Sequence, residues 1–168
     1  SGRAVAAFPE GGTRDGRELG AFHARIFAAA VDADAAVQPV AAERSVLKLA
    51  GERADKRVAH WQQVAVAACE QSGRNRVPVV GEILPLAKYL ARPFDGTRLI
   101  LAPGADGALA RKARPSRPLA ILIGPEGGWS PAELDLAARA GCAPLALGPR
   151  VLRTETAGLA ALAAMQTV

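Results

Sequence analysis

The sequence contains little of what marks a membrane or secreted protein. No apolar stretch in its 168 residues reaches the roughly 20 residues that a membrane-spanning helix needs. Residues 1–20 hold no continuous apolar core of the kind found in signal peptides. These absences predict a soluble protein, with the cytoplasm as its compartment.

Cysteine and histidine are scarce, with two residues of each type. Cys69 and Cys142 lie far apart in the sequence and match no metal-ligand spacing, so we interpret them as free thiols rather than as a disulfide or redox pair. His23 and His60 have no Cys or His neighbour and are interpreted as surface or packing residues. The sequence therefore predicts no metal site.

The common nucleotide-binding and nucleophile motifs are also missing. No G-x-G-x-x-G follows an expected strand, and neither G-x-x-x-x-G-K-[ST] nor G-x-S-x-G occurs. A conventional nucleotide-binding α/β enzyme is therefore disfavoured, although it remains an alternative. If the chain binds a nucleotide-like ligand, it does so by another arrangement.

Positive charge, by contrast, is plentiful. The formal net charge is +5, and arginine supplies 17 of the basic residues against 4 lysines. Because guanidinium groups bind phosphate at two points, this composition suits a nucleic-acid partner. A GC-rich coding sequence would also enrich arginine, so composition alone leaves RNA binding undecided.

From Glu52 onward, helical and extended patterns alternate. Residues 52–72 show apolar residues at helical spacing, and the helix that they predict is expected to end at Gly73. Ser130 and Glu133 form a predicted capping box at the start of another helix, and Pro131 suits its first helical position. A short helix is further expected from Pro85 and a closing helix from a capping Thr154. Strands are expected over 77–84, 97–102, 119–124 and 143–148. Continuous apolar strands between helices predict an α/β fold, with a parallel sheet flanked by helices.

Three loops leave the carboxyl ends of the last three expected strands, at 102–104, 124–128 and 148–153. Ligands of parallel sheets bind at this edge. The glycines of "GPEGG" let the backbone approach a ligand closely. Glu126, between them, can order the loop through its amides or contact a partner. Most Gly-Pro turns are only tight loops, but two of them after buried strands favour a site.

The loop "GPRVLR" is the more unusual one. Arg150 and Arg153 flank the apolar residues Val151 and Leu152. In one interpretation the apolar pair lines a pocket for a flat ring, and the arginines face phosphate. In the other, the apolar pair belongs to the core and the arginines are solvated. The residues themselves do not decide between the two.

Three blocks carry a resemblance to a known family. "CEQSGRNRVPVV", "LIGPEGGWSPAEL" and "LALGPRVLRTETAGLAAL" resemble the ribosomal RNA small subunit methyltransferase E family of the SPOUT superfamily, and "ERSV" at 43–46 fits a fourth block. The resemblance runs roughly from Val37 to the C-terminus. It implies a SPOUT fold with a C-terminal deep trefoil knot, a homodimer, and S-adenosylmethionine as the cofactor. The implied reaction is methylation of uridine N3 in small-subunit (16S) ribosomal RNA.

The same resemblance implies roles for individual residues. The cofactor would be bound by Leu101, Ala102, Pro103, Ile123, Gly124, Pro125, Glu126, Gly128, Leu147, Gly148, Val151, Leu152 and Arg153. RNA would be bound by Glu70, Gln71, Arg74, Arg76 and Arg150. Because the N3 proton must leave, Arg153 and Arg74 are candidates for stabilising the uridine anion, and Glu126 and Glu155 are candidates for the general base.

The resemblance also sets a domain organisation and leaves alternatives. Family members carry a β-barrel RNA-binding domain first, so residues 1–35 are interpreted as a remnant or linker of it, and residues 36–168 as the SPOUT methyltransferase domain. One alternative is another SPOUT methyltransferase, acting on transfer RNA or large-subunit ribosomal RNA. A second is a non-catalytic RNA-binding remnant.

Overall fold

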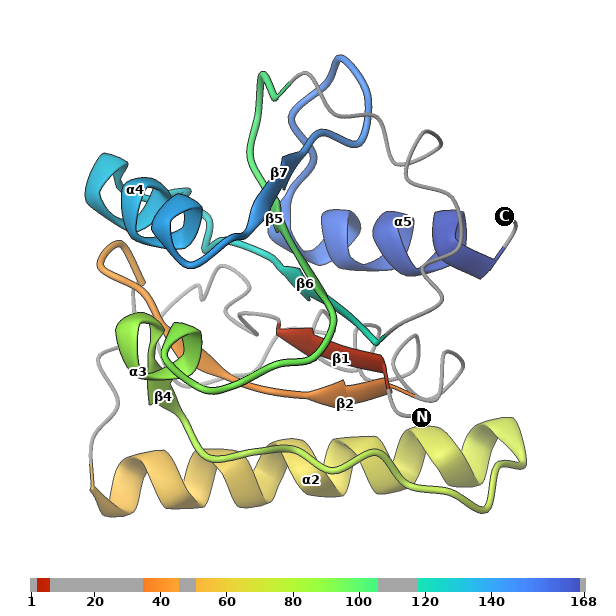
Figure 1. Ribbon diagram of the computed structural model, residues 1–168. Helices are drawn as coiled ribbons and strands as arrows, with labels where there is room; N and C mark the ends of the chain where they lie inside the picture. The colour runs from red at the N-terminus through yellow and green to blue at the C-terminus, as the bar shows by residue number, and fades with distance from the viewer. Residues whose placement is uncertain (1–2, 7–34, 46–50, 106–117, 167–168) are drawn as a thin grey trace.

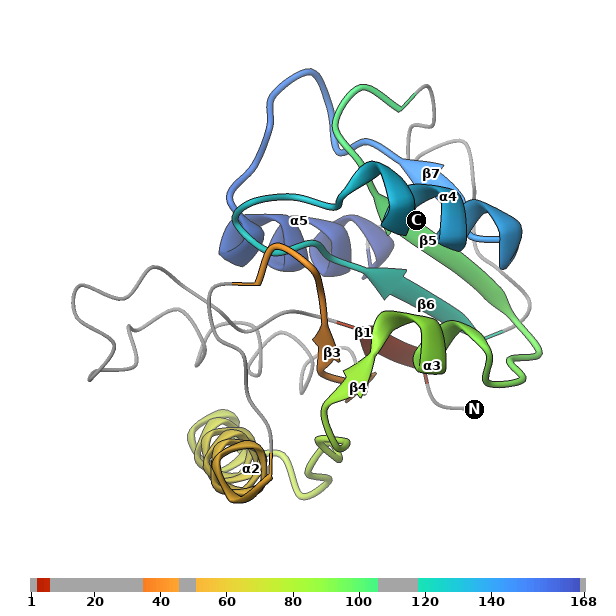
Figure 2. The ribbon, with the colours of Figure 1, turned by 90° about the vertical axis from the view of Figure 1, so that its left-hand side faces the viewer.

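The computed structural model describes residues 3–6, 35–45, 51–105 and 118–166. These form a parallel five-stranded sheet with helices on both faces (Figures 1 and 2). Its strands lie in the order β2 (Ala35–Val37), β1 (Arg3–Ala6), β6 (Leu119–Leu122), β5 (Thr97–Leu101) and β7 (Ala143–Leu145). β3 (Val40–Ala41) pairs in parallel with β4 (Leu84–Pro85) in a smaller sheet. The predicted α/β fold is confirmed. Among the described residues, no helix is long and apolar enough to cross a membrane.

Alternate residues of the central strands enter two different cores. Leu99 and Ile121 pack in the core beneath α2 (Glu52–Ser72) and α5 (Thr154–Gln166). Ile100 and Leu122 pack in the core beneath α3 (Leu86–Leu90) and α4 (Pro131–Arg139). Figure 2 shows α5 and α4 on opposite sides of the sheet. Because both faces are covered, β5 and β6 read as continuous apolar runs rather than as alternating ones.

The predicted helix boundaries are largely confirmed. α2 ends at Gly73, whose φ of 66° is left-handed, as glycine readily permits. α4 begins with the predicted capping box, in which the Glu133 amide donates to Ser130 Oγ and the Ser130 amide donates to Glu133 Oε2. α3 follows Pro85 as expected.

The predicted cap of the last helix is wrong by one residue. The Ala157 amide donates to the Arg153 carbonyl at 2.8 Å, so Arg153 holds the capping position and Thr154 is the first helical residue. The Thr154 hydroxyl instead donates to the Gly124 carbonyl. A contact across 30 residues has therefore replaced the local one that the sequence suggested.

The strand predicted over 77–84 is also mostly wrong. Only Val80 pairs in parallel with Val37, and a two-residue strand follows at Leu84–Pro85. Pro78 and Gly81 interrupt the β-branched run, because proline lacks a ladder donor and glycine weakens a strand. The outward-facing groups of this segment are bonded by Gln62 of α2. Its side chain accepts from the Val80 amide at 2.9 Å and donates to the Pro78 carbonyl at 3.1 Å.

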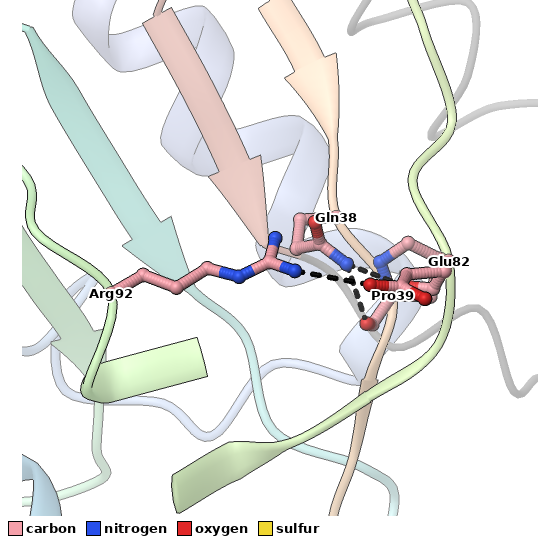
Figure 3. Close-up of polar contacts among 4 residues, drawn as sticks. All are labelled: Gln38, Pro39, Glu82 and Arg92. Atoms are coloured by element: carbon pink, nitrogen blue, oxygen red, sulfur yellow. Dashed lines mark hydrogen bonds and ion pairs between the residues drawn. The ribbon is translucent and has the colours of Figure 1, made fainter. Parts of the chain in front are cut away.

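A second polar cluster fixes the turn between β2 and β3 (Figure 3). Gln38 Nε2 donates to the carbonyls of Pro39 at 3.1 Å and Glu82 at 2.5 Å, and the Glu82 carboxylate pairs with Arg92 at 3.0 Å. A Cβ at Gly81 would lie 2.7 Å from Gln38 Oε1, so a larger residue there would make the Gln38 side chain shift.

The N-terminal strand β1 lies between β2 and β6 of the central sheet. Arg3–Ala6 pairs in parallel with both β2 and β6, in the middle of the sheet. These four residues therefore share one sheet with strands of residues 36–168, and the boundary between the two predicted domains stays a prediction. The sequence also predicts a loop over 8–20 and a strand or short helix over 21–36, but residues 7–34 lie outside the described residues. It likewise predicts a loop over 103–118, of which residues 106–117 lie outside the described residues.

Candidate functional site

A cavity of about 450 Å³ lies at the carboxyl ends of β5, β6 and β7. Its walls come from residues 101–103 at the end of β5, from residues 123–126, 128 and 129 after β6, and from residues 145–148 and 150–154 at and after β7. Ala157 of α5 also lines it. The cavity is therefore at the edge of the sheet where ligands of parallel α/β folds bind.

The structure brings together every residue predicted to hold the cofactor. All of them line this cavity, and so does Arg150, which was predicted to bind RNA. Cofactor binding by these residues stays a prediction. Residues that the sequence analysis did not assign to the site also line it: Trp129, Leu145, Ala146, Thr154 and Ala157. Trp129 directly follows the glycine loop, which was the available indication for it.

The glycines of "GPEGG" are needed for different physical reasons. A Cβ at Gly124 would lie 3.0 Å from the indole nitrogen of Trp129, and one at Gly127 would lie 3.0 Å from Cβ of Arg44. Gly128 has a φ of +67° and open space where a Cβ would stand. The loop therefore packs tightly on two sides and leaves its third glycine open at the cavity wall.

Two side-chain hydrogen bonds join the three strand exits. The indole N–H of Trp129 donates to the Leu101 carbonyl at 3.1 Å, which ties the loop after β6 to the end of β5. The buried Thr154 hydroxyl donates to the Gly124 carbonyl at 3.0 Å, which ties the segment after β7 to the same loop. Both donors lie within the cavity wall, so its shape is fixed by contacts between segments distant in sequence.

The loop after β7 presents both apolar and basic side chains. Val151 is 75% exposed, so it is not a core residue. Leu152 is half-buried and packs against the core beneath α2 and α5. Arg150 and Arg153 are both exposed and line the cavity. The structure thus favours the pocket interpretation of this loop for Val151, and gives Leu152 a part in both the pocket and the core.

Not every predicted site residue lies at the cavity. Glu126 lines it and is exposed, but Glu155 belongs to α5 and its side chain lies outside the described residues. Arg74, predicted as catalytic, does not line it. The segment at Val80 pairs in parallel with β2 at Val37. The residues before Val80, Arg74 among them, therefore lie toward the amino ends of the strands, opposite the cavity. Figure 1 shows the end of α2 on that side.

The other residues of the "EQSGRNR" block lie with Arg74. Glu70, Gln71 and Arg76 are exposed at the end of α2 and in the turn that follows it. The buried Cys69 thiol donates to the Arg76 carbonyl at 3.4 Å, and the Arg74 amide donates to the Cys69 carbonyl. The block is therefore an ordered surface turn, separate from the cavity within one chain.

Burial, rather than reactivity, characterises the second cysteine. Desolvation raises the pKa of the Cys142 thiol, and the Arg98 guanidinium opposes this shift. Desolvation likewise raises the pKa of the Tyr89 hydroxyl, again opposed by Arg98. Both residues belong to the core beneath α3 and α4. A buried thiol with a raised pKa is a poor nucleophile, so Cys142 is a packing residue.

A family model described as an RNA methyltransferase domain matches residues 25–166 of this chain. The chain belongs to this family. The match begins ahead of residue 36, inside the segment that the sequence analysis assigned to a remnant of another domain.

The RNA methyltransferase family contains proteins that carry a more specific name. The ribosomal RNA small subunit methyltransferase E of Bacillus subtilis is 36% identical over 136 residues, which are 76% of this chain and 53% of that protein. The protein of the same name from Buchnera aphidicola (subsp. Schizaphis graminum) is 33% identical over 112 residues, 66% of this chain and 46% of that protein. The predicted resemblance is confirmed, and the chain spans about half the length of these relatives.

A solved structure gives the same result. The ribosomal RNA small subunit methyltransferase E from Neisseria gonorrhoeae, bound to S-adenosyl methionine, superposes with a TM-score of 0.82 at 37% identity. The similarity covers 98% of this chain and 65% of that one. The fold of this chain is therefore the fold of the Neisseria protein, whose structure was solved with S-adenosyl methionine bound.

Proposed function

We propose that this chain is the methyltransferase domain of an S-adenosylmethionine-dependent enzyme that methylates N3 of a uridine in small-subunit (16S) ribosomal RNA. The observation that carries the proposal is the single cavity formed at three strand exits. Its lining residues come from the sequence blocks that resemble the family. The names of the relatives support the choice of RNA, and the bound ligand of the Neisseria protein supports the choice of cofactor.

The residues of the cavity fit this cofactor. Leu101, Ile123, Leu147 and Leu152 provide apolar walls for an adenine ring. Gly128 leaves room for a ligand to approach the backbone closely. The cavity volume falls within the range of roughly 300–1,000 Å³ that is typical of small-molecule sites. When bound, S-adenosylmethionine would supply the methyl group from its sulfonium.

Two kinds of side chain would act on the uridine. N3 carries a proton, so it becomes a nucleophile only when that proton is removed or the resulting anion is stabilised. Arg153, exposed at the cavity, would stabilise the negative charge that develops on the uracil ring. Glu126, on the neighbouring loop, would take the proton, with Glu155 as the second candidate base. The target base would first have to leave its stack to reach them.

The proposal includes a homodimer and a C-terminal trefoil knot. The knot is proposed from the family resemblance, and the return of the chain after β7 to the loop after β6, where Thr154 at the start of α5 bonds Gly124, is compatible with it. Arg74 would act at a cavity only if a second copy brought it there. The proposal assigns residues 36–168, together with β1, to the methyltransferase domain in the cytoplasm. Glu70, Gln71, Arg74, Arg76 and Arg150 would contact RNA.

Methyl transfer to defined RNAs tests the proposal. The chain would be incubated with radiolabelled S-adenosylmethionine and with small ribosomal subunits, naked 16S ribosomal RNA, large subunits or transfer RNA. We expect label in small-subunit RNA, and nuclease digestion with mass spectrometry should locate it on uridine N3. Label in transfer RNA or large subunits would favour the alternative SPOUT enzyme. RNA binding without any label would favour the non-catalytic alternative, and absence of cofactor binding would exclude the proposed site.

A further inference from the structure

A residue outside the cavity holds one of its walls in place. Arg44 lies in the turn after β3, more than 80 positions before the glycine loop in the sequence. Its Nη1 donates to the carbonyl of Gly127 at 3.1 Å and to the carbonyl of Trp129 at 3.4 Å. One guanidinium therefore bonds two main-chain carbonyls of a single loop.

The stem of Arg44 also packs against the same loop. A Cβ placed on Gly127 would lie 3.0 Å from Arg44 Cβ, 3.4 Å from its carbonyl oxygen and 3.6 Å from its Cδ. Gly127 is thus the position at which the turn of Arg44 and the glycine loop meet most closely. This contact explains a glycine that has an ordinary negative φ and does not line the cavity.

The turn that carries Arg44 is itself fixed. The Ser45 amide donates to the Ala42 carbonyl, and the Ala42 amide donates to Ser45 Oγ, both at 3.2 Å. The Glu43 amide donates at 2.8 Å to Oε1 of Glu133, whose Oε2 accepts the Ser130 amide. The buried carboxylate of Glu133 therefore joins the turn to the residue that follows Trp129, and Arg44 projects from a rigid base.

The opposite side of the loop belongs to the cavity. Glu126, Gly128 and Trp129 line it, whereas Arg44 does not. The turn is closed within itself by the Gly128 amide, which donates to the Pro125 carbonyl at 2.8 Å. Arg44 thus acts on the outside of a tight turn whose inside faces the ligand space.

We propose that Arg44 is a positioning residue for the cofactor, which sets the shape of the wall formed by Glu126, Gly128 and Trp129. This inference rests on the proposed function, because it assigns the cavity to S-adenosylmethionine. Without the guanidinium, two carbonyls lose their shared donor and the turn relaxes away from its bound shape. A loop that is already held in its binding shape loses little conformational entropy when the cofactor binds. Loss of this pre-organisation therefore appears mainly as weaker affinity for the cofactor.

Calorimetric titration of S-adenosylmethionine into Arg44→Ala and Arg44→Lys tests this role. We expect the Kd to rise roughly tenfold in Arg44→Ala, as for the loss of hydrogen bonds from a charged group. Arg44→Lys should fall between, since an ammonium replaces the planar fork by a single point of charge. In methyl transfer, KM for the cofactor should rise, and kcat at saturating cofactor should fall by a smaller factor, because Glu126, the proposed base, lies on the same loop. Arg92→Ala is the matched control, because Arg92 pairs with Glu82 outside the cavity.

Thermal denaturation of each variant separates positioning from folding. A folded Arg44→Ala that binds the cofactor as tightly as the unchanged chain would overturn the inference and leave the proposed function intact. If Arg44→Ala does not fold, Gly127→Ala decides instead, because its methyl group displaces Arg44 by only a few tenths of an ångström. An unchanged Kd in that variant overturns the inference equally. If the unchanged chain itself binds no S-adenosylmethionine, the proposed function fails first.

Discussion

The hydroxyl of Thr154 donates a hydrogen bond to the carbonyl of Gly124 at 3.0 Å. Thr154 is the first residue of α5, and Gly124 is the first residue of the glycine loop after β6. Both line the cavity, and Thr154 is buried. One side chain therefore sets the position of the last loop relative to the loop that precedes α4.

Replacing this hydroxyl should weaken both the fold and the site. In Thr154→Val the shape of the side chain is kept, but the Gly124 carbonyl loses a donor. We expect a loss of about 1–2 kcal/mol in the free energy of unfolding, measured by urea denaturation. Thr154→Ser retains the hydroxyl and should stay close to the unchanged chain. Equal losses in the two variants would show that packing, rather than the hydrogen bond, is responsible.

Gly128→Val should abolish cofactor binding. A branched side chain there is strained at a φ of +67°, and it projects into the space that the ligand would occupy. Gly141→Val is a close control, because Gly141 has a φ of +77° with open space around it and does not line the cavity. Both variants should lose stability, but calorimetry should show lost binding only in Gly128→Val. Unchanged affinity there would refute the placement of the cofactor.

Arg153→Ala should lower turnover far more than stability. Its side chain is exposed, and its capping function uses only the backbone carbonyl, which alanine retains. If the guanidinium stabilises the uridine anion, kcat should fall on the order of a hundredfold, as for other lost stabilising donors. The denaturation midpoint should hardly move. Arg139→Ala, an exposed arginine of α4 outside the cavity, should keep full turnover. An unchanged rate in Arg153→Ala would remove Arg153 from the mechanism.

Stability should decrease at alkaline pH. Burial raises the pKa of Cys142 above the ordinary thiol value of 9.0, and that of Tyr89 above the ordinary phenol value of 10.0. Above those ordinary values the unfolded chain releases protons that the folded chain still holds, so folding is disfavoured. The contribution is fully present below pH 9.0 and is lost as the pH rises through the raised values. Urea denaturation from neutral to alkaline pH should show this, with a smaller decrease in Cys142→Ala.

The parts of the site that could be predicted are those marked by neighbouring residues in the sequence. Apolar runs marked β5 and β6, and glycines marked the loops that follow them. A buried run that ends in a Gly-Pro turn indicates a strand exit without any knowledge of the rest of the chain. The residues predicted to bind the cofactor came from matching the sequence blocks to a family, and all of them line one cavity.

The parts that were missed depend on contacts between distant segments. Thr154 looked like a helix cap, because its partner Gly124 lies 30 residues away. Residues 77–84 looked like a strand, because nothing local shows that Gln62 will bond their outer groups. Arg44 gave no indication of its role, since Gly127 and Trp129 become its neighbours only after folding. β1 is four residues long and has too short a pattern to be recognised.

Gln62 also limits how copies of this chain can associate. Its amide occupies the outward donor of Val80 and the outward acceptor of Pro78, as a neighbouring β-strand would. A strand from another molecule cannot add at that place without displacing this side chain. If two copies pair, as the proposed function includes, their sheets do not join at Pro78 and Val80 while Gln62 holds these groups.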